Sequence, residues 1–213
     1  HADTYPDVII ALEALGLKTN HIKVLLYQFV TLIQNGEKVK MSTRQANFIT
    51  LDQLIKELGT DVVRYFFVMR SMNSHLDFDL DIAKDQSQKN PVFYLQYAYA
   101  RISNIIKRAD ELGFNQNSPY DTALLNHKDE IHMLKHMARF PEIIDMAFEN
   151  LEPQYIANYL QKLASYFHKF YSQCKVITDD KSLAYARIRL IKSVKIILNN
   201  GFSILGISSP EQM

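Results

Sequence analysis

The stretch NPVFYLQYAYAR, from Asn90 to Arg101, decides the fold of this chain. Asn90 followed by Pro91 is typical of a helix N-cap and the first helical position, where the missing N–H of proline costs nothing. Apolar residues then recur at helical spacing as far as Leu112, and Gly113 is a typical helix terminator. The sequence therefore predicts one long helix between Pro91 and Gly113.

Toward the C-terminus the chain is predicted to be helical almost throughout. Short loops separate the apolar segments, and short loops between helices imply antiparallel neighbours in a bundle. Pro141 is expected to kink or interrupt a helix, because proline cannot donate the backbone hydrogen bond. Helices are expected over about residues 122–138, then to Phe148, from Pro153 past Phe170, and from Asp179 or Asp180 to a stop at Asn200-Gly201, before an apolar tail from Phe202 to Ile207.

Toward the N-terminus, residues 1–89 mix helical and strand patterns. The apolar run from Ile22 to Ile33 is typical of a buried strand, Asn35-Gly36 of a turn, and Lys38 to Met41 of a returning strand. Short helices are expected from Val8 to Leu15, from Thr50 to Gly59 and from Asp61 to Arg70. The fold class is therefore mainly α, with an α/β part over residues 1–89 and an all-α bundle over residues 90–213.

Composition limits the classes of function. The chain has 24 Lys and Arg against 23 Asp and Glu, which excludes a generic polycation but allows local basic patches. The single cysteine, Cys174, cannot form an internal disulfide, so a reducing compartment, the cytoplasm, is expected. No apolar run approaches the roughly 18 residues of a membrane span, and HADTYPD at the start has no signal-peptide pattern. No Met begins the sequence, so we expect it to be part of a longer protein. We also expect a monomer that does not associate with membranes.

A basic, hydroxyl-rich loop follows the predicted second strand. It runs from Val39 to Asn47 and reads VKMSTRQAN. Such a loop suits a phosphate group, because cationic side chains and backbone N–H groups can neutralise charge that develops during phosphoryl chemistry. Taken by itself, a solvated surface loop explains the same residues.

This loop resembles the K-M-S-K-S signature of class I aminoacyl-tRNA synthetases in its arginyl form. The first three positions match, but Thr43 stands where the signature has its second Lys. In the family that Lys stabilises the ATP triphosphate as pyrophosphate leaves, and Arg44 and Lys38 are candidates to supply the missing charge. The resemblance implies that the catalytic residues of the loop are Lys40, Met41, Ser42, Thr43 and Arg44.

The flanking segments are similar to the arginyl-tRNA synthetase family in the same order. The resemblance covers nearly the whole chain. It implies that residues 1–89 are the C-terminal end of a class I Rossmann-type catalytic domain, with the KMSKS-like loop and a stem-contact region. It also implies that residues 90–213 are a DALR-type anticodon-binding helical bundle. The similar segments are FITLDQL (48–54), GTDVVRYFF (59–67), SHLDFDL (74–80), the stretch from Asn90 to Arg101, and LGISSPEQM (205–213).

The same resemblance implies an activity for the parent protein. An arginine–tRNA ligase activates arginine with ATP and Mg²⁺ and transfers it to tRNA(Arg), without a tightly bound metal. The segment HADTY at the start resembles the family segment beside the ATP and amino-acid pockets, so His1 and Tyr5 are candidate binding residues. The family's H-I-G-H signature would lie before His1, and this fragment alone is therefore expected to be inactive.

A second candidate site lies on the long helix. Tyr94, Tyr97 and Arg101 occupy positions i, i+3 and i+7 and share one helical face. Aromatic rings can stack on an unpaired base while a guanidinium holds its edge or phosphate. The resemblance adds Tyr171 and Met213 to this pocket for the middle anticodon base. Without the resemblance, Tyr94 and Tyr97 would be interpreted as core residues with hydroxyls at the rim.

Other titratable residues carry weaker signals. His132 and His136 have i, i+4 spacing but lack the Glu of an H-E-x-x-H motif and a third ligand, so no metal is expected. Asp77 and Asp79 are better explained as caps than as a metal or acid–base pair. A basic set on the last helix either contacts phosphate or forms a solvated face: Lys181, Arg187, Arg189, Lys192 and Lys195.

Two alternatives to the arginyl interpretation remain open. The first is another class I synthetase with a helical anticodon domain, cysteinyl or methionyl, which the stretch from Asn90 to Arg101 and the final Met disfavour. The second is an RNA-binding module without catalysis. An H-I-G-H motif before His1 would distinguish a synthetase from such a module.

Overall fold

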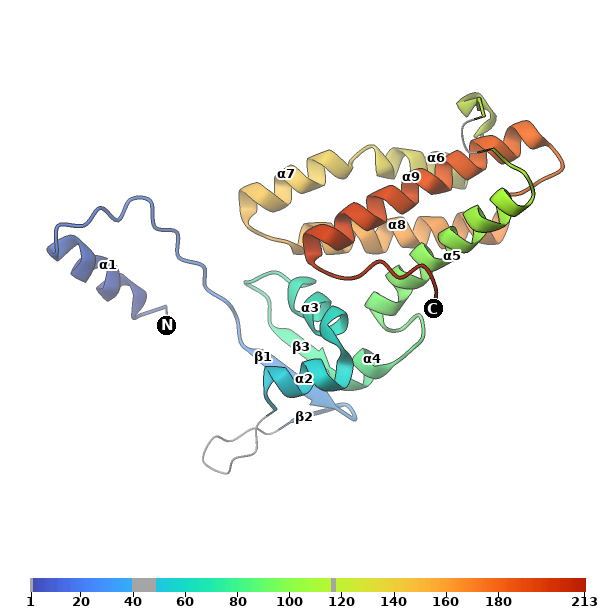
Figure 1. The fold of residues 1–213 in the computed structure, drawn as a ribbon. Helices are drawn as coiled ribbons and strands as arrows, with labels where there is room; N and C mark the ends of the chain where they lie inside the picture. The colour runs from blue at the N-terminus through green and yellow to red at the C-terminus, as the bar shows by residue number, and fades with distance from the viewer. Residues whose placement is uncertain (1, 40–48, 116–117) are drawn as a thin grey trace.

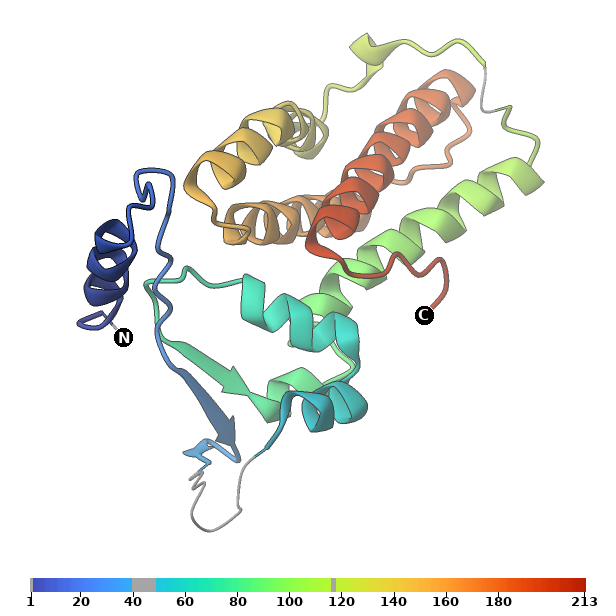
Figure 2. The same cartoon turned by 60° about the vertical axis from the view of Figure 1, so that its left-hand side comes forward.

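The computed structural model describes residues 2–39, 49–115 and 118–213. Within these ranges a bundle of long helices lies above a small sheet that is flanked by short helices, and the N-terminal helix lies apart from both (Figures 1 and 2). The arrangement agrees with the predicted mainly α class.

The N-terminal helix α1 (Tyr5–Ala14) confirms the helix predicted from Val8 to Leu15. It begins earlier than predicted because Pro6 fits the first helical turn. No residue of α1 is buried. An extended segment joins it to the sheet (Figure 1).

The prediction of a buried strand from Ile22 to Ile33 is wrong for its first part. Strand β1 covers only Val30–Gln34, because its pairing with β3 (Leu76–Asp79) begins at Val30. Within the described ranges, the residues before Val30 have no partner strand. Several of their apolar side chains are exposed: Ile22, Val24, Leu25, Leu26, Tyr27 and Phe29. A continuous apolar run is typical of a strand that is buried on both faces. Such burial requires neighbouring layers of structure, and the described part of the chain places none against these residues.

The three-stranded sheet has the order β2-β1-β3. Strand β2 (Glu37–Lys38) is antiparallel to β1, and the predicted turn at Asn35 and Gly36 joins them with φ values of 53° and 75°. Positive φ at both central residues is typical of the tight turns that match the twist of a hairpin. The predicted continuation of β2 through Met41 reaches residues outside the described ranges.

Strand β3 lies parallel to β1, so the chain must cross over between them. Helices α2 (Leu51–Leu58) and α3 (Thr60–Val68) form part of this crossover. Thr50 caps α2 as predicted, in a reciprocal capping box with Gln53. Asp79 caps α4 (Leu80–Lys84) with two backbone hydrogen bonds, which confirms its expected role.

The bundle begins where Asn90 caps α5 (Pro91–Glu111), as predicted. The helix predicted over residues 122–138 is instead a 3₁₀ turn, η2 (Thr122–Leu124), and a separate helix α6 (Lys128–Met137) capped by His127. Pro141 lies in the first turn of α7 (Phe140–Asn150), where it interrupts no hydrogen bond. Helices α8 (Gln154–Gln173) and α9 (Lys181–Leu205) complete the bundle, and Asp180 caps α9.

The predicted stop of the last helix at Asn200-Gly201 is wrong. Helix α9 continues through Gly201 and ends at Gly206, which has φ 68°. A Cβ added at Gly201 would lie 2.6 Å from a methyl group of Leu160 in α8. The glycine therefore permits close packing of two helices and does not terminate one.

One hydrophobic core joins the two halves of the chain. The same cluster contains Leu32 of the sheet, Phe66 of α3 and Phe202 of α9. Tyr65 is 1% exposed, and its hydroxyl donates a 3.2 Å hydrogen bond to the backbone oxygen of Ala157 in α8. The sheet half and the helical half therefore support each other.

Candidate functional site

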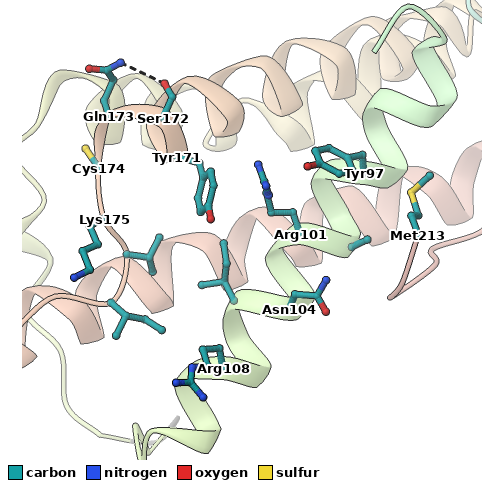
Figure 3. Close-up of a pocket in the computed structure, with 14 residues that line it drawn as sticks. Tyr97, Arg101, Asn104, Arg108, Tyr171, Ser172, Gln173, Cys174, Lys175 and Met213 are labelled. Carbon is teal, nitrogen blue, oxygen red and sulfur yellow. Dashed lines mark hydrogen bonds between the residues drawn. The ribbon is translucent and has the colours of Figure 1, made fainter. Parts of the chain in front are cut away.

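A cavity of about 840 Å³ opens between α5, the C-terminal end of α8 and the end of the chain. Tyr97, Arg101, Tyr171 and Met213, predicted to form one site, all line it (Figure 3). The remaining lining residues are Ala100, Asn104, Ile105, Arg108, Ser172, Gln173, Cys174, Lys175, Val176 and Ile177.

The guanidinium of Arg101 lies between two tyrosine rings. Its Cζ is 5.0 Å from the ring centroid of Tyr97 and 4.6 Å from that of Tyr171. Tyr97 is one helical turn before Arg101 on α5, and Tyr171 approaches from the last turns of α8 (Figure 3). Cation–π attraction at these distances orients the rings and the guanidinium together.

Further rings support this arrangement from the side of α8. The ring centroids of His168 and Tyr97 lie 5.9 Å apart at an interplanar angle of 24°, and those of Phe167 and Tyr171 lie 6.0 Å apart. Burial lowers the pKa of His168, which favours the neutral imidazole. His168 therefore acts as a packing surface for Tyr97 and adds no cation at neutral pH.

Tyr94 does not line the cavity. Its ring packs 4.6 Å from that of His168, and burial raises the pKa of its phenol. The structure thus separates Tyr94 from the other members of the predicted set, and a direct contact of Tyr94 with a base stays a prediction.

Several polar lining residues were missed by sequence reasoning. Asn104 and Arg108 continue the face of α5 that carries Tyr97 and Arg101, so helical spacing could have identified them. Gln173 is the last residue of α8 and Lys175 lies beyond it, where helical spacing gives little guide. These four residues add amide groups and two cations to the aromatic wall.

The cavity is suited to an unpaired nucleotide. Aromatic faces stack on bases of any identity, and guanidinium and ammonium groups bind phosphate. No Asp or Glu occurs among the described residues that line it, so an anion meets no opposing carboxylate side chain there. Burial raises the pKa of the Cys174 thiol, which disfavours a nucleophilic thiolate.

The other predicted site residues are not brought together. His1 and the loop residues from Lys40 to Arg44 lie outside the described ranges. Tyr5 is the first residue of α1 and is 39% exposed. Their roles therefore stay predictions.

Two features are absent from residues 2–39, 49–115 and 118–213. These residues contain no group of three or more His, Cys, Asp or Glu side chains that could hold a metal ion. They also contain no helix of the length and apolar character needed to cross a membrane. His136, one of the two histidines at i, i+4 spacing, packs on the Tyr159 ring at 4.2 Å.

Comparison with known protein families agrees with the geometry. Residues 95–213 match the DALR anticodon binding domain, and residues 1–109 match tRNA synthetases class I (M). The two matches overlap over residues 95–109, so a domain boundary between residues 89 and 90 stays a prediction.

Curated relatives and solved structures add to these family matches. The chain is 49% identical over its whole length to the arginine–tRNA ligase of Salinibacter ruber, and 45% identical to that of Chlorobaculum tepidum. It spans 38% and 39% of the lengths of these relatives. A crystal structure of the proposed arginyl-tRNA synthetase of Campylobacter jejuni is 30% identical, with a TM-score of 0.82, and the match covers 98% of this chain and 45% of that one. The chain therefore belongs to the class I tRNA synthetases, its helical half is a DALR anticodon binding domain, and the curated relatives that it matches are arginine–tRNA ligases.

Proposed function

We propose that the intact protein is an arginine–tRNA ligase, which activates arginine with ATP and attaches it to tRNA(Arg). The curated relatives carry this name, and the chain spans about two fifths of their length. Within that activity, the described residues supply the anticodon-binding part. We place the middle anticodon base in the cavity lined by Tyr97, Arg101, Tyr171 and Met213.

The observation that carries this proposal is the position of Arg101 between two tyrosine rings. An extruded base can stack on the exposed ring of Tyr171, while the guanidinium of Arg101 reaches its edge or phosphate. Arg108 and Lys175 flank the same cavity and suit the phosphates on either side of the base. The pair between Arg108 and Glu111 is exposed on both sides, so exchanging it for a phosphate contact costs little.

The chain carries almost no net charge, so attraction to RNA must be local. Its formal charge is +1, yet Arg101, Arg108 and Lys175 all line the one cavity. Such clustering favours a nucleic acid held at one site over unspecific adhesion along the whole surface.

For the catalytic part, we propose that the loop from Lys40 to Arg44 binds the phosphates of ATP, with Mg²⁺ as counter-ion. Class I membership implies the use of ATP. The matches to the family signature at Lys40, Met41 and Ser42 support the placement, and His1 and Tyr5 are proposed contacts of ATP or arginine. Thr43 replaces the second Lys of the signature, and Arg44, the next residue in the sequence, is the candidate to supply the missing positive charge.

The second candidate function is an RNA-binding module without catalysis, because the cavity would serve it equally well. Assays of the intact protein distinguish the ligase from the RNA-binding module. A ligase shows arginine-dependent exchange of pyrophosphate into ATP and charges tRNA(Arg), whereas a module binds the tRNA and shows neither reaction. Binding without exchange by the intact protein would therefore leave the cavity assignment in place and remove the ligase.

Arg101→Ala is expected to raise the Kd for tRNA(Arg) about 5-fold, because one charge-assisted contact is lost. If Arg101 contacts phosphate, the slope of log Kd against log salt should also fall by about one ion. The measurement is a binding titration between about 50 and 200 mM salt. Arg139→Ala, which removes an exposed arginine paired with Glu142, is the matched control. An Arg101 variant that binds like the Arg139 variant would contradict the proposed site.

A further inference from the structure

We propose that Asp61 of α3 is a positioning residue for the anticodon cavity, acting through the tail that carries Met213. The proposal rests on the proposed function of that cavity. The tail (residues 206–213) leaves the end of α9 and runs past α3 toward α5 (Figures 1 and 2). Met213 then stands at the rim of the cavity, beside Tyr97 (Figure 3).

The carboxylate of Asp61 is the central anchor of this tail. Its Oδ1 accepts the backbone N–H of Ser208 at 3.1 Å, and its Oδ2 accepts the Ser208 hydroxyl and, at 2.8 Å, the side-chain amide of Gln96. The Gln96 amide also donates to the backbone oxygen of Ser208 at 3.2 Å. Gln96 is 9% exposed, so its position on α5 is set by packing. The three residues thus tie α3, α5 and the tail together.

Two further contacts hold the tail on either side of Ser208. The Nε of Arg64 donates to the backbone oxygen of Leu205 at 2.5 Å, and the Arg64 side chain covers Gly206 so closely that an added Cβ would lie 2.5 Å from that Nε. Farther along, Lys195 forms a 2.8 Å ion pair with Glu211. This outer pair is exposed on the Glu211 side and contributes little by itself.

These anchors restrict where Met213 can lie. It is the second residue after Glu211, with Gln212 between them, and an extended chain covers at most about 3.6 Å per residue. The position of Met213 is therefore determined within about 7 Å once the tail is held at Ser208 and Glu211. Without the anchor at Ser208, the segment from Ser209 to Met213 would keep the exposed ion pair at Glu211, which restricts it little.

The consequence is a contact between the two halves of the chain at the site itself. Asp61 belongs to α3, in the half that carries the proposed ATP loop, whereas Met213 contributes to the cavity of the helical half. Asp61 does not line the cavity, so any effect on a bound base is indirect, and the proposal assigns that effect to the tail. That property separates it from residues that touch the base.

The test is a double-mutant cycle on the intact protein, measured as the Kd for transcribed tRNA(Arg). Asp61→Asn removes the charge and leaves one acceptor oxygen for three donors, so the anchor is weakened with almost no change in volume. We expect Met213→Ala to raise Kd about 5-fold through loss of a thioether contact with the base, and Asp61→Asn to raise it about 3- to 5-fold. The double variant should bind no more weakly than Met213→Ala, because both changes remove the same contact.

The controls separate positioning from general stability. Asp77→Asn makes the same chemical change at an exposed carboxylate of β3 and should leave Kd unchanged. A tRNA with a changed middle anticodon base should bind weakly and be indifferent to Asp61→Asn. Should Asp61→Asn prevent folding, Ser208→Ala is the alternative variant, because it removes the hydroxyl but keeps the backbone hydrogen bond to Asp61. It should weaken tRNA binding less than Asp61→Asn, and this effect should also vanish when Met213→Ala is already present.

Each result has a defined meaning. Losses that add in the double variant, or that fall equally on both tRNAs, would overturn the positioning role. Normal binding by Asp61→Asn, with a clear loss for Met213→Ala, would overturn this inference and leave the anticodon cavity in place. Normal binding by both Met213→Ala and Tyr171→Ala would overturn the cavity assignment as well.

Discussion

Tyr171→Ala is expected to raise the Kd for tRNA(Arg) about 5- to 150-fold, because one base–aromatic stack is worth about 1–3 kcal/mol. Tyr171 is 37% exposed and lies at the last turns of α8, so its ring faces the cavity and is available to a base. The same exposure means that truncation leaves no large internal void, and the free energy of unfolding should change little. The measurement is a binding titration, with thermal unfolding measured in parallel.

The matched control for this prediction is Tyr166→Ala. Tyr166 lies on the same helix and also contacts a cation, with Lys162 Nζ 5.0 Å from its ring centroid, but it does not line the cavity. It should therefore leave the Kd near that of the unchanged protein. A tRNA with a different middle anticodon base should bind poorly to both variants. Equal losses for Tyr171→Ala on both tRNAs would show that the ring does not read this base.

Arg187→Ala is expected to lower the free energy of unfolding by about 3–5 kcal/mol, because it leaves a buried carboxylate without its cation. Arg187 Nε lies 2.7 Å from Glu130 Oε1, and the Glu130 side chain is 0% exposed. The other oxygen of Glu130 accepts the backbone N–H of His127 as part of the cap of α6. In a chain of this size the melting temperature should fall by roughly 6–20 °C in thermal unfolding.

Two comparisons make this stability prediction specific. Arg139→Ala breaks an ion pair that is more than 60% exposed on both sides, and it should cost no more than about 1 kcal/mol. Arg187→Met combined with Glu130→Leu should recover most of the loss, because an apolar pair of similar volume needs no counter-charge. A full loss in that double variant would show that the charge pair is not the source of the effect.

Arg187 also bears on the candidate site. Its Nη1 donates a 2.8 Å hydrogen bond to the backbone oxygen of Lys175, which lines the anticodon cavity. The basic set on the last helix had been open to two interpretations, phosphate contact or a solvated face. For Arg187 the structure shows a third role, because its guanidinium pairs with a buried glutamate and holds the cavity wall.

Much of the local structure follows from short-range signals. Asn90 before Pro91 caps α5, Thr50 with Gln53 caps α2, and the turn at Asn35-Gly36 joins β1 to β2. Each signal acts within a few residues, because a cap or a turn satisfies backbone groups that lie next to it in the chain. For the same reason, helical spacing alone places Tyr97 and Arg101 on one face.

The errors come from features that depend on distant neighbours. Gly201 looks like a helix terminator, but its lack of a Cβ serves the contact with Leu160 of α8. The apolar residues between Ile22 and Phe29 look like a buried strand, yet no described element covers them. A glycine or an apolar run has the same local appearance in either situation, so only the packing partner decides between them.

By itself, then, the sequence determined the mainly α class, the starts of most helices, the helical face of Tyr97 and Arg101 and, through family resemblance, the candidate members Tyr171 and Met213. Only the tertiary structure decided that Arg101 lies between Tyr97 and Tyr171, that Tyr94 stands outside the cavity, and that Ser208 binds Asp61 from 147 residues away. The physical reason is one of range. Caps, turns and helical faces are set by backbone geometry over a few residues, whereas a cavity exists only where the packing of α5 against α8 and α9 brings separate segments together.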